Sequence, residues 1–185
     1  MLLIFTGNGK GKTSSAVGIA LRAWGQGKRV LFVSFLKGNN RAGEFKAIRC
    51  LNTPFFKVYS FGRECPYSEA DCCPGKRECI VYGDNISAGD YQRVQQGLDL
   101  VGREMAAGDW DLIVLDEMVN VFNLFPACRE TILKLMNGKK PGMDMVLTGR
   151  NCSPELAAQA DLISELVAVR HPFSRGSKAK RGIDY

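Results

Sequence analysis

The chain has 185 residues and a mass of 20.4 kDa, with 45% hydrophobic and 24% charged residues, as expected of one globular domain. This composition excludes a disordered, collagen-like or coiled-coil protein, and no apolar run approaches the roughly 18 residues that a membrane span needs. The net charge of +6 gathers around Lys10 and Lys12 and in residues 170–181, which favours a small anionic ligand over nucleic acid. The first residues lack the features of a signal peptide, so we expect a cytoplasmic protein with no membrane partner.

Short apolar segments alternate with helical patterns along the chain. The predicted strands cover residues 2–5, 29–36, 55–61, 112–115, 143–148 and 162–169. The predicted helices cover residues 13–25, 87–107 and 126–137, and Ser153 is expected to cap a short helix that begins at Pro154. This alternation predicts an α/β fold with a mostly parallel sheet and helices on both faces. We expect residues 1–185 to form one domain, with an irregular cysteine-rich insertion at about residues 64–89.

A glycine-rich motif lies between the first predicted strand and the first predicted helix. Residues 6–13 read Thr-Gly-Asn-Gly-Lys-Gly-Lys-Thr, with Thr6 where the usual P-loop has a glycine. In a P-loop, backbone N–H groups surround phosphate oxygens at the start of a helix. Lys12 is then expected to meet the phosphates and Thr13 to hold Mg²⁺. The expected nucleotide-binding residues are Thr6, Gly7, Asn8, Gly9, Lys10, Gly11, Lys12, Thr13, Ser14 and Arg150.

An acidic pair follows the apolar strand at residues 112–115, in the manner of a Walker B strand. Because ligands of open α/β sheets bind at the carboxyl ends of the strands, Asp116 and Glu117 are expected to reach the Mg²⁺ held by Thr13. We therefore expect Thr13, Asp116 and Glu117 as metal ligands, and Lys12, Thr13 and Glu117 as catalytic residues. Arg150 also follows a predicted strand, and its guanidinium is a candidate partner for a phosphate or for an acid near the site.

The seven cysteines form an odd number, so a complete disulfide framework is impossible. Four of them fall in the irregular segment, namely Cys65, Cys72, Cys73 and Cys79. Their spacing differs from the paired cysteines of zinc ribbons. Both a Zn or Fe–S site and a set of free thiols therefore stay open.

Several segments together resemble the P-loop ATP:corrinoid adenosyltransferases of the CobA type. They are residues 6–13, the strand segment 32–38, Val114-Leu115-Asp116-Glu117, Leu147-Thr148-Gly149-Arg150, residues 160–166 and the ending Gly182-Ile183-Asp184-Tyr185. The resemblance extends over nearly the whole chain in the same order, and it accounts for Thr6, because the family's own P-loop is written in this way. It also implies a RecA-like sheet in which the strand 143–148 lies between the strands 2–6 and 112–115. Thr148 and Asp116 would then lie beside Thr13.

The resemblance implies a transfer reaction on cobalt. A corrinoid whose cobalt is reduced to Co(I) attacks the ribose C5′ of MgATP, a cobalt–carbon bond forms, and triphosphate leaves. It also implies ATP bound in reverse along the P-loop, an electron donor for cobalt such as a flavoprotein, and a homodimer. No nucleic acid is expected as a partner. A cobalt nucleophile needs no nucleophilic serine, cysteine or histidine from the protein.

The corrinoid side departs from the family pattern. Members of the family carry an N-terminal extension that covers the corrinoid, whereas the first strand here begins near Leu2, so we expect that lid to be missing. An aromatic loop after the third strand pushes away the lower cobalt ligand in the family, and Phe61 and Tyr67 are the candidates for this role here. We expect residues 64–89 to form part of the corrinoid pocket and to be mobile without substrate. The alternative is a surface insertion held by a metal at the four cysteines.

Two other functions remain open from the sequence. One is a P-loop ATPase or GTPase that hydrolyses the γ-phosphate, and the other is a nucleotide-binding regulator without catalysis. The phosphate product separates the three: triphosphate indicates the transferase, orthophosphate the hydrolase, and neither the regulator.

Overall fold

The apolar segments of the sequence form the strands of one sheet in the computed structural model, which describes residues 1–38, 42–64, 79–170, 176, 180 and 182–183. The six strands are β1 (Leu2–Thr6), β2 (Val30–Phe35), β3 (Phe56–Phe61), β4 (Leu112–Asp116), β5 (Asp144–Thr148) and β6 (Leu162–Glu165). All the pairings are parallel, in the order β3-β2-β4-β5-β1-β6. This order confirms the α/β class and the expected place of β5 between β1 and β4.

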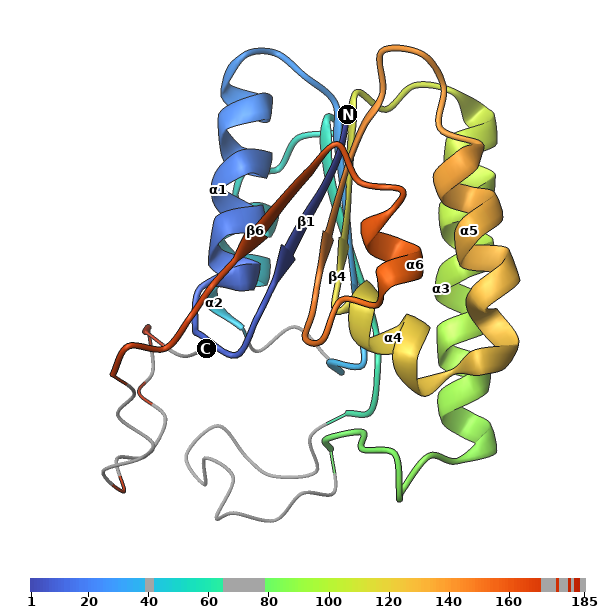
Figure 1. The fold of residues 1–185 in the computed structure, drawn as a ribbon. Coiled ribbons are helices and arrows are strands. Elements are labelled where there is room, and N and C mark those ends of the chain that lie inside the picture. Colours follow the sequence, from blue (N-terminus) through green and yellow to red (C-terminus); the bar gives the residue numbers. More distant parts are fainter. Residues whose placement is uncertain (39–41, 65–78, 171–175, 177–179, 181, 184–185) are drawn as a thin grey trace.

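Helices cover both faces of the sheet (Figure 1). They are α1 (Lys12–Gly25), α2 (Gly43–Cys50), α3 (Ala88–Ala107), α4 (Met118–Leu124), the 3₁₀ helix η1 (Pro126–Cys128), α5 (Arg129–Asn137) and α6 (Pro154–Ala157). In Figure 1, α1 and α2 lie on one side of the sheet, and α3, α4, α5 and α6 lie on the other. No helix among the described residues has the length and apolar character that crossing a membrane requires.

Alternation along the central strands divides the core into two layers. On β2, Leu31, Val33 and Phe35 pack on the side of α3 and α5, whereas Val30 and Phe32 pack on the side of α1 and α2. All five side chains are fully buried. A parallel strand covered on both faces needs apolar residues at every position, which is why the sequence shows continuous apolar runs here. The core therefore fixes the sheet, and the sheet brings the carboxyl ends of all its strands to one edge.

Two helices absent from our sequence prediction are short. The helix α2 has eight residues, buries only Phe45 and Ile48, and begins after Ala42 without a side-chain cap. The helix α4 has seven residues and is separated from β4 only by Glu117, and its first residues, Met118 and Val119, are buried. Neither helix offers the capping residue and long apolar period by which a helix is recognised in a sequence.

Most predicted boundaries differ from the observed ones by one residue, the end of β6 differs by more, and two predicted caps are confirmed. The strand β6 ends at Glu165 rather than at residue 169, and Val167 and Val169 are exposed. The predicted helix 126–137 begins as the 3₁₀ helix η1, and the helix α1 begins at Lys12. The backbone N–H of Leu156 donates to Ser153 Oγ at 3.3 Å, and that of Ser87 donates to Asp90 Oδ2 at 2.9 Å at the start of α3.

Candidate active site

The glycine-rich loop joins the end of β1 to the start of α1. Gly7 and Gly11 have φ values of 100° and 104°, a backbone conformation that L side chains rarely adopt. The loop also rests against the chain after β6, where the Gly9 N–H donates to the Leu166 carbonyl oxygen at 2.6 Å. A Cβ at Gly9 would lie 2.7 Å from that oxygen. The glycines are thus required both by conformation and by the close approach of another backbone.

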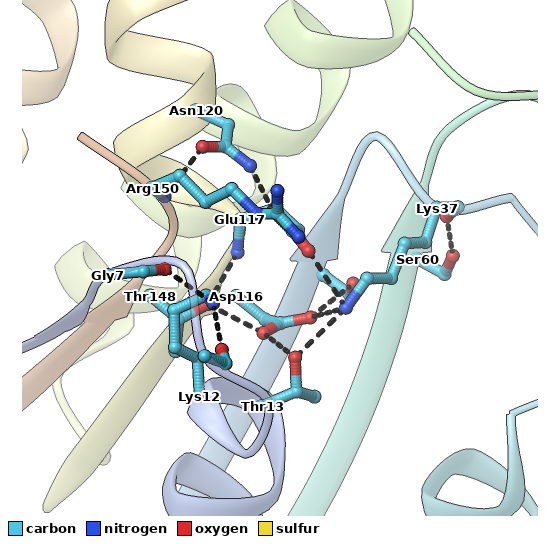
Figure 2. A network of polar contacts seen from close by, with 12 residues as sticks. Gly7, Lys12, Thr13, Lys37, Ser60, Asp116, Glu117, Asn120, Thr148 and Arg150 are labelled. Atoms are coloured by element: carbon cyan, nitrogen blue, oxygen red, sulfur yellow. Dashed lines mark hydrogen bonds and ion pairs between the residues drawn. The ribbon is translucent and has the colours of Figure 1, made fainter. Parts of the chain in front are cut away.

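Lys12 lies at the first position of α1 and turns back over the loop (Figure 2). Its ammonium donates to the carbonyl oxygens of Gly7 at 2.8 Å and Gly9 at 2.7 Å. Burial lowers the pKa of Lys12, and the nearby positive charge of Arg150 lowers it further. Lys12 and the nearby Arg150 thus place two positive charges at the loop, which suits an anionic ligand such as a polyphosphate.

Asp116, the last residue of β4, is the most buried charged group of the site. Its side chain is 0% exposed, and its carboxylate accepts four hydrogen bonds. The donors are Thr13 Oγ1 (2.8 Å) and Thr148 Oγ1 (2.7 Å) to Oδ1, and Ser34 Oγ (3.0 Å) and Lys37 Nζ (2.8 Å) to Oδ2. Burial alone would raise the pKa of Asp116, but the charge of Lys37 and these hydrogen bonds hold it below the usual range. Asp116 is therefore a buried carboxylate, and it joins α1, β2, β4 and β5.

Lys37 follows β2 and completes this network, although we did not predict it as a site residue. Its ammonium lies 3.0 Å from Thr13 Oγ1, 2.8 Å from Asp116 Oδ2 and 3.1 Å from Glu117 Oε1 (Figure 2). Burial would lower the pKa of Lys37, but the charges of Asp116 and Glu117 outweigh that effect and raise it. The only signal in the sequence was the position of this lysine just after a buried strand, at the edge where ligands bind.

Glu117 is held in a left-handed backbone conformation, with φ of 64°, between β4 and α4. Its N–H donates to Thr148 Oγ1 at 2.9 Å, and its carboxylate accepts a hydrogen bond from the Asn120 amide. Asn120 Oδ1 in turn accepts the backbone N–H of Arg150 at 2.8 Å. Asn120, a second site residue that sequence analysis missed, therefore links the acidic pair to the Thr-Gly-Arg turn.

The sheet thus brings together most of the residues expected for nucleotide and metal binding. Thr13, Asp116 and Glu117 meet within one hydrogen-bonded network, with Lys12 and Arg150 beside it. Asn8, Lys10 and Ser14 lie on the exposed side of the loop and of the first turn of α1. Thr6 is buried, and its hydroxyl accepts the Cys152 N–H at 3.3 Å.

The oxygen donors of this network fit a magnesium ion. A hydroxyl and two carboxylates converge on a single cationic group, the ammonium of Lys37. Hard divalent cations prefer such oxygen ligands, and Mg²⁺ in nucleotide enzymes takes one or two carboxylates together with phosphate oxygens. Among the described residues no group of three or more His, Cys, Asp or Glu side chains could hold a metal on its own. The arrangement therefore suits a metal that shares its ligands with a nucleotide.

A hollow of about 750 Å³ opens at the end of β3, where Ser60 donates a hydrogen bond to the Lys37 carbonyl oxygen. It is lined by Ser60, Phe61, Gly62, Arg63, Glu64, Arg93 and Gln96. The ring of Phe61 also packs on Phe35, with ring centres 6.3 Å apart, so only part of it faces the hollow. Tyr67, the other aromatic residue that we predicted for corrinoid binding, lies outside the described residues.

Arg63 links the rim of this hollow to the start of α3. It donates from Nε to Asp90 Oδ1 at 2.8 Å and from a terminal nitrogen to Oδ2 at 2.5 Å, while Asp90 is only 2% exposed. The same nitrogen donates to the Asn85 carbonyl at 2.6 Å. Of the four cysteines considered for a metal site, only Cys79 is described, and it is partly buried; Cys65, Cys72 and Cys73 lie outside the described residues.

Comparison with known proteins gives a consistent set of similarities. A model of the family described as ATP:corrinoid adenosyltransferase BtuR/CobO/CobP matches residues 1–185. The corrinoid adenosyltransferase CobA of Salmonella typhimurium strain LT2 is 32% identical over 187 residues, covering 100% of this chain and 85% of that protein. A corrinoid adenosyltransferase of Escherichia coli strain K12 is 30% identical over 185 residues, with the same coverage. A solved KaiC-like protein of Pyrococcus horikoshii OT3 has a TM-score of 0.51 at 17% identity, covering 89% of this chain and 71% of that one, and supports the fold alone.

Proposed function

The chain belongs to the ATP:corrinoid adenosyltransferase family, and we propose that it transfers the 5′-deoxyadenosyl group of ATP to the Co(I) centre of a corrinoid, in adenosylcobalamin synthesis or salvage. Cobalt supplies an electron pair to C5′, the C5′–O bond breaks, and triphosphate leaves with the electrons of that bond. The observation that carries this proposal is the contact of 2.8 Å between Thr13 and Asp116. It joins the P-loop to the acidic strand in a chain that the family matches throughout.

The loop and its cations are proposed to bind the leaving group, the triphosphate. Negative charge grows on the triphosphate as the C5′–O bond breaks. Donors that already point at this charge stabilise it without having to reorganise. We propose that the loop N–H groups, Lys12 and Arg150 bind the triphosphate, with Lys12 as the main charge donor. Asn8, Lys10 and Ser14 contribute from the exposed rim, and Thr6, which is buried, fixes the start of the loop.

Mg²⁺ is proposed as the cofactor, with Thr13, Asp116 and Glu117 as its ligands. When bound, it would neutralise part of the charge on the triphosphate. Thr13 offers its hydroxyl oxygen from the first turn of α1, and the two acids offer theirs from the end of β4. Asn120 and Thr148 keep these oxygens in place through their hydrogen bonds to Glu117 and Asp116.

The hollow at the end of β3 is the proposed place of the corrinoid. It lies at the same edge of the sheet as the network of Asp116, and Phe61 lines it. An apolar ring at this position would lie against the corrin, and Tyr67 is proposed to assist from residues 64–89. We further propose a cytoplasmic homodimer that receives electrons for cobalt from a separate donor, such as a flavoprotein.

The phosphate product tests the proposed function. The purified protein is incubated under anaerobic conditions with MgATP and chemically reduced cobalamin, and the products are followed by ³¹P NMR. Adenosyl transfer releases triphosphate in a one-to-one ratio with consumed cobalamin. Release of orthophosphate with ADP, at the same rate with and without cobalamin, would instead establish a hydrolase.

A further inference from the structure

The ammonium of Lys37 contacts the same oxygen atoms that are proposed to bind the metal. Thr13 Oγ1, Asp116 Oδ2 and Glu117 Oε1 lie 3.0, 2.8 and 3.1 Å from its Nζ (Figure 2). These three oxygens come from α1, from the end of β4 and from the residue that follows it, yet they converge on one point. A cation of the protein itself therefore lies where the metal would be bound.

The lone pairs of Asp116 cannot serve both cations. An ionised carboxylate has about four acceptor positions, and those of Asp116 are taken by three hydroxyl groups and by Lys37. The hydroxyl groups of Ser34 and Thr148 are buried, and each belongs to a strand of the sheet. Oδ2 accepts only from Ser34 and Lys37 among the described residues, and the Lys37 side chain is 38% exposed, so Lys37 is the partner of Oδ2 that can move outward. A metal that binds Oδ2 of Asp116 must therefore displace Lys37.

The backbone of Lys37 is held while its side chain has room to move. Its carbonyl oxygen accepts a hydrogen bond from Ser60 Oγ at 2.5 Å, and a Cβ at Gly62 would lie 2.4 Å from its carbonyl carbon. The chain is thus clamped between β2 and β3 at this point. A rotation about the side-chain bonds is sufficient to carry the ammonium away from Asp116.

We propose that Lys37 is a built-in counter-ion that keeps the metal site closed to free Mg²⁺, so that the metal enters only together with the nucleotide. The inference rests on the proposed metal ligands of the preceding subsection. Free Mg²⁺ would have to expel the ammonium from Asp116 and Glu117, the two carboxylates that it contacts among the described residues, and would supply no replacement anion. A triphosphate supplies such an anion, because its oxygens bind both the entering metal and the displaced ammonium.

Metal binding without nucleotide tests the proposal directly. Mn²⁺, a spectroscopic substitute for Mg²⁺, is titrated into the nucleotide-free protein and its binding is followed by EPR. Lys37→Met removes the charge at nearly constant length and is expected to bind Mn²⁺ at least roughly tenfold more tightly than the parent, or about 1.4 kcal/mol. Lys37→Arg keeps the charge and is expected to bind no better than the parent. Equal Mn²⁺ affinity in Lys37→Met and the parent overturns the proposal.

Lys28→Met is the matched control. Lys28 also pairs with an aspartate, Asp111, at 3.4 Å, but the pair is exposed and lies at the opposite end of the sheet. This variant is expected to bind Mn²⁺ as the parent does. If Lys28→Met gains the same affinity as Lys37→Met, the effect is one of net charge and the proposal is wrong.

Thermal unfolding provides a second readout if Lys37→Met folds poorly. Its Asp116 carboxylate lacks a counter-ion, so the variant is expected to melt at a temperature well below that of the parent in EDTA. In 10 mM MgCl₂ its melting temperature is expected to rise toward that of the parent, because a metal that binds the folded state stabilises it. A variant that MgCl₂ restores neither in melting nor in refolding yield contradicts the proposal. Neither measurement contains ATP or corrinoid, so its result does not depend on adenosyl transfer. A failure of the counter-ion proposal can therefore be told apart from a failure of the proposed function.

Discussion

The carboxylate of Asp116 stays charged without solvent because four donors from different elements surround it. The sequence could predict this residue, since an acid after an apolar strand stands out. It could not predict Lys37 or Ser34, because a lysine and a serine near a strand are ordinary residues until the sheet order brings β2 beside β4. Asn120 was missed because its role follows from the turn between β4 and α4, which places its amide between Glu117 and Arg150. The acidic pair was thus predictable from the sequence, whereas Lys37, Ser34 and Asn120, which hydrogen-bond to it, were not.

Lys12→Ala is expected to abolish adenosyl transfer almost completely. The variant loses one donor that already points at the leaving group, which costs about 3 kcal/mol of transition-state stabilisation, or roughly a hundredfold in rate. The rate is measured with saturating MgATP and reduced corrinoid. Lys10→Ala, on the exposed side of the loop, is the comparison and is expected to lose much less. An unchanged rate for Lys12→Ala would end the P-loop interpretation.

Asp116→Asn is expected to raise the Mg²⁺ concentration needed for half-maximal activity more than it alters nucleotide affinity in EDTA. The amide keeps the size of the side chain and loses the charge that attracts a divalent ion. Activity is titrated with MgCl₂ at fixed ATP, and nucleotide affinity is measured separately by calorimetry. Identical metal titrations for variant and parent would mean that Asp116 is only a structural anchor.

The ion pair of Arg63 and Asp90 fastens the end of β3 to the start of α3 at the rim of the proposed corrinoid hollow. Hydrogen bonds from Arg63 hold the pKa of Asp90 well below its usual range, and those from Ser87 contribute. The pair therefore adds stability above the pKa of an unfolded aspartate, about 3.9. That contribution falls as pH decreases through the lower pKa of the folded protein.

Asp90→Asn is accordingly expected to cost about 2 to 3 kcal/mol of unfolding free energy at pH 7. The difference from the parent should shrink as the pH falls below about 4. Urea unfolding at several pH values measures both quantities. Glu130→Gln breaks an exposed ion pair with Lys134 and is expected to change little at any pH. A loss for Asp90→Asn that is independent of pH would show that packing, and not charge, holds this joint.

Gly9→Ala is expected to destabilise the loop by about 1 to 3 kcal/mol and to weaken ATP binding. Its new methyl group would press on the Leu166 carbonyl oxygen. This oxygen belongs to the backbone, so it cannot rotate away as a side chain could. Gly18→Ala in the middle of α1 is the control, because its Cβ meets nothing within 4 Å. That variant should gain about 0.5 to 1 kcal/mol. Equal melting temperatures and ATP affinities for the two variants would contradict this account of the loop.

The predictability of each element followed its length and its signals. The helices α1 and α3 have 14 and 20 residues with apolar faces, and their extents were predicted nearly as observed. The strand β6 was predicted too long because the apolar run continues past Glu165. Its partner β1 ends at Thr6, and the last bond between the two strands is the hydrogen bond from the Leu166 N–H to the Thr6 carbonyl oxygen. Beyond it, Leu166 contacts the glycine loop instead of a strand. A strand ends where its neighbour ends, which a single segment does not reveal.

The order of the sheet is what makes the molecule a candidate enzyme. The strands β4, β5 and β1 lie side by side, so the acidic pair, the Thr-Gly-Arg turn and the glycine loop share one edge. Propensity predicts strands but not their order, and here the order came from resemblance to a family and is confirmed by the structure. The hollow at the end of β3 lies at the same edge of the sheet, so both proposed substrates have a place on one side of the molecule.

The cobalt–carbon bond is the most direct test of adenosyl transfer. The protein is mixed under anaerobic conditions with MgATP carrying ¹³C at C5′ and with Co(I) cobalamin, and the labelled carbon is followed by NMR while the visible spectrum is recorded. Adenosyl transfer is expected to move the C5′ signal to that of an alkyl carbon on cobalt and to give a spectral change that light reverses, and neither event is expected in Lys12→Ala. Consumption of ATP with the label still bonded to oxygen and the cobalt spectrum unchanged would contradict it.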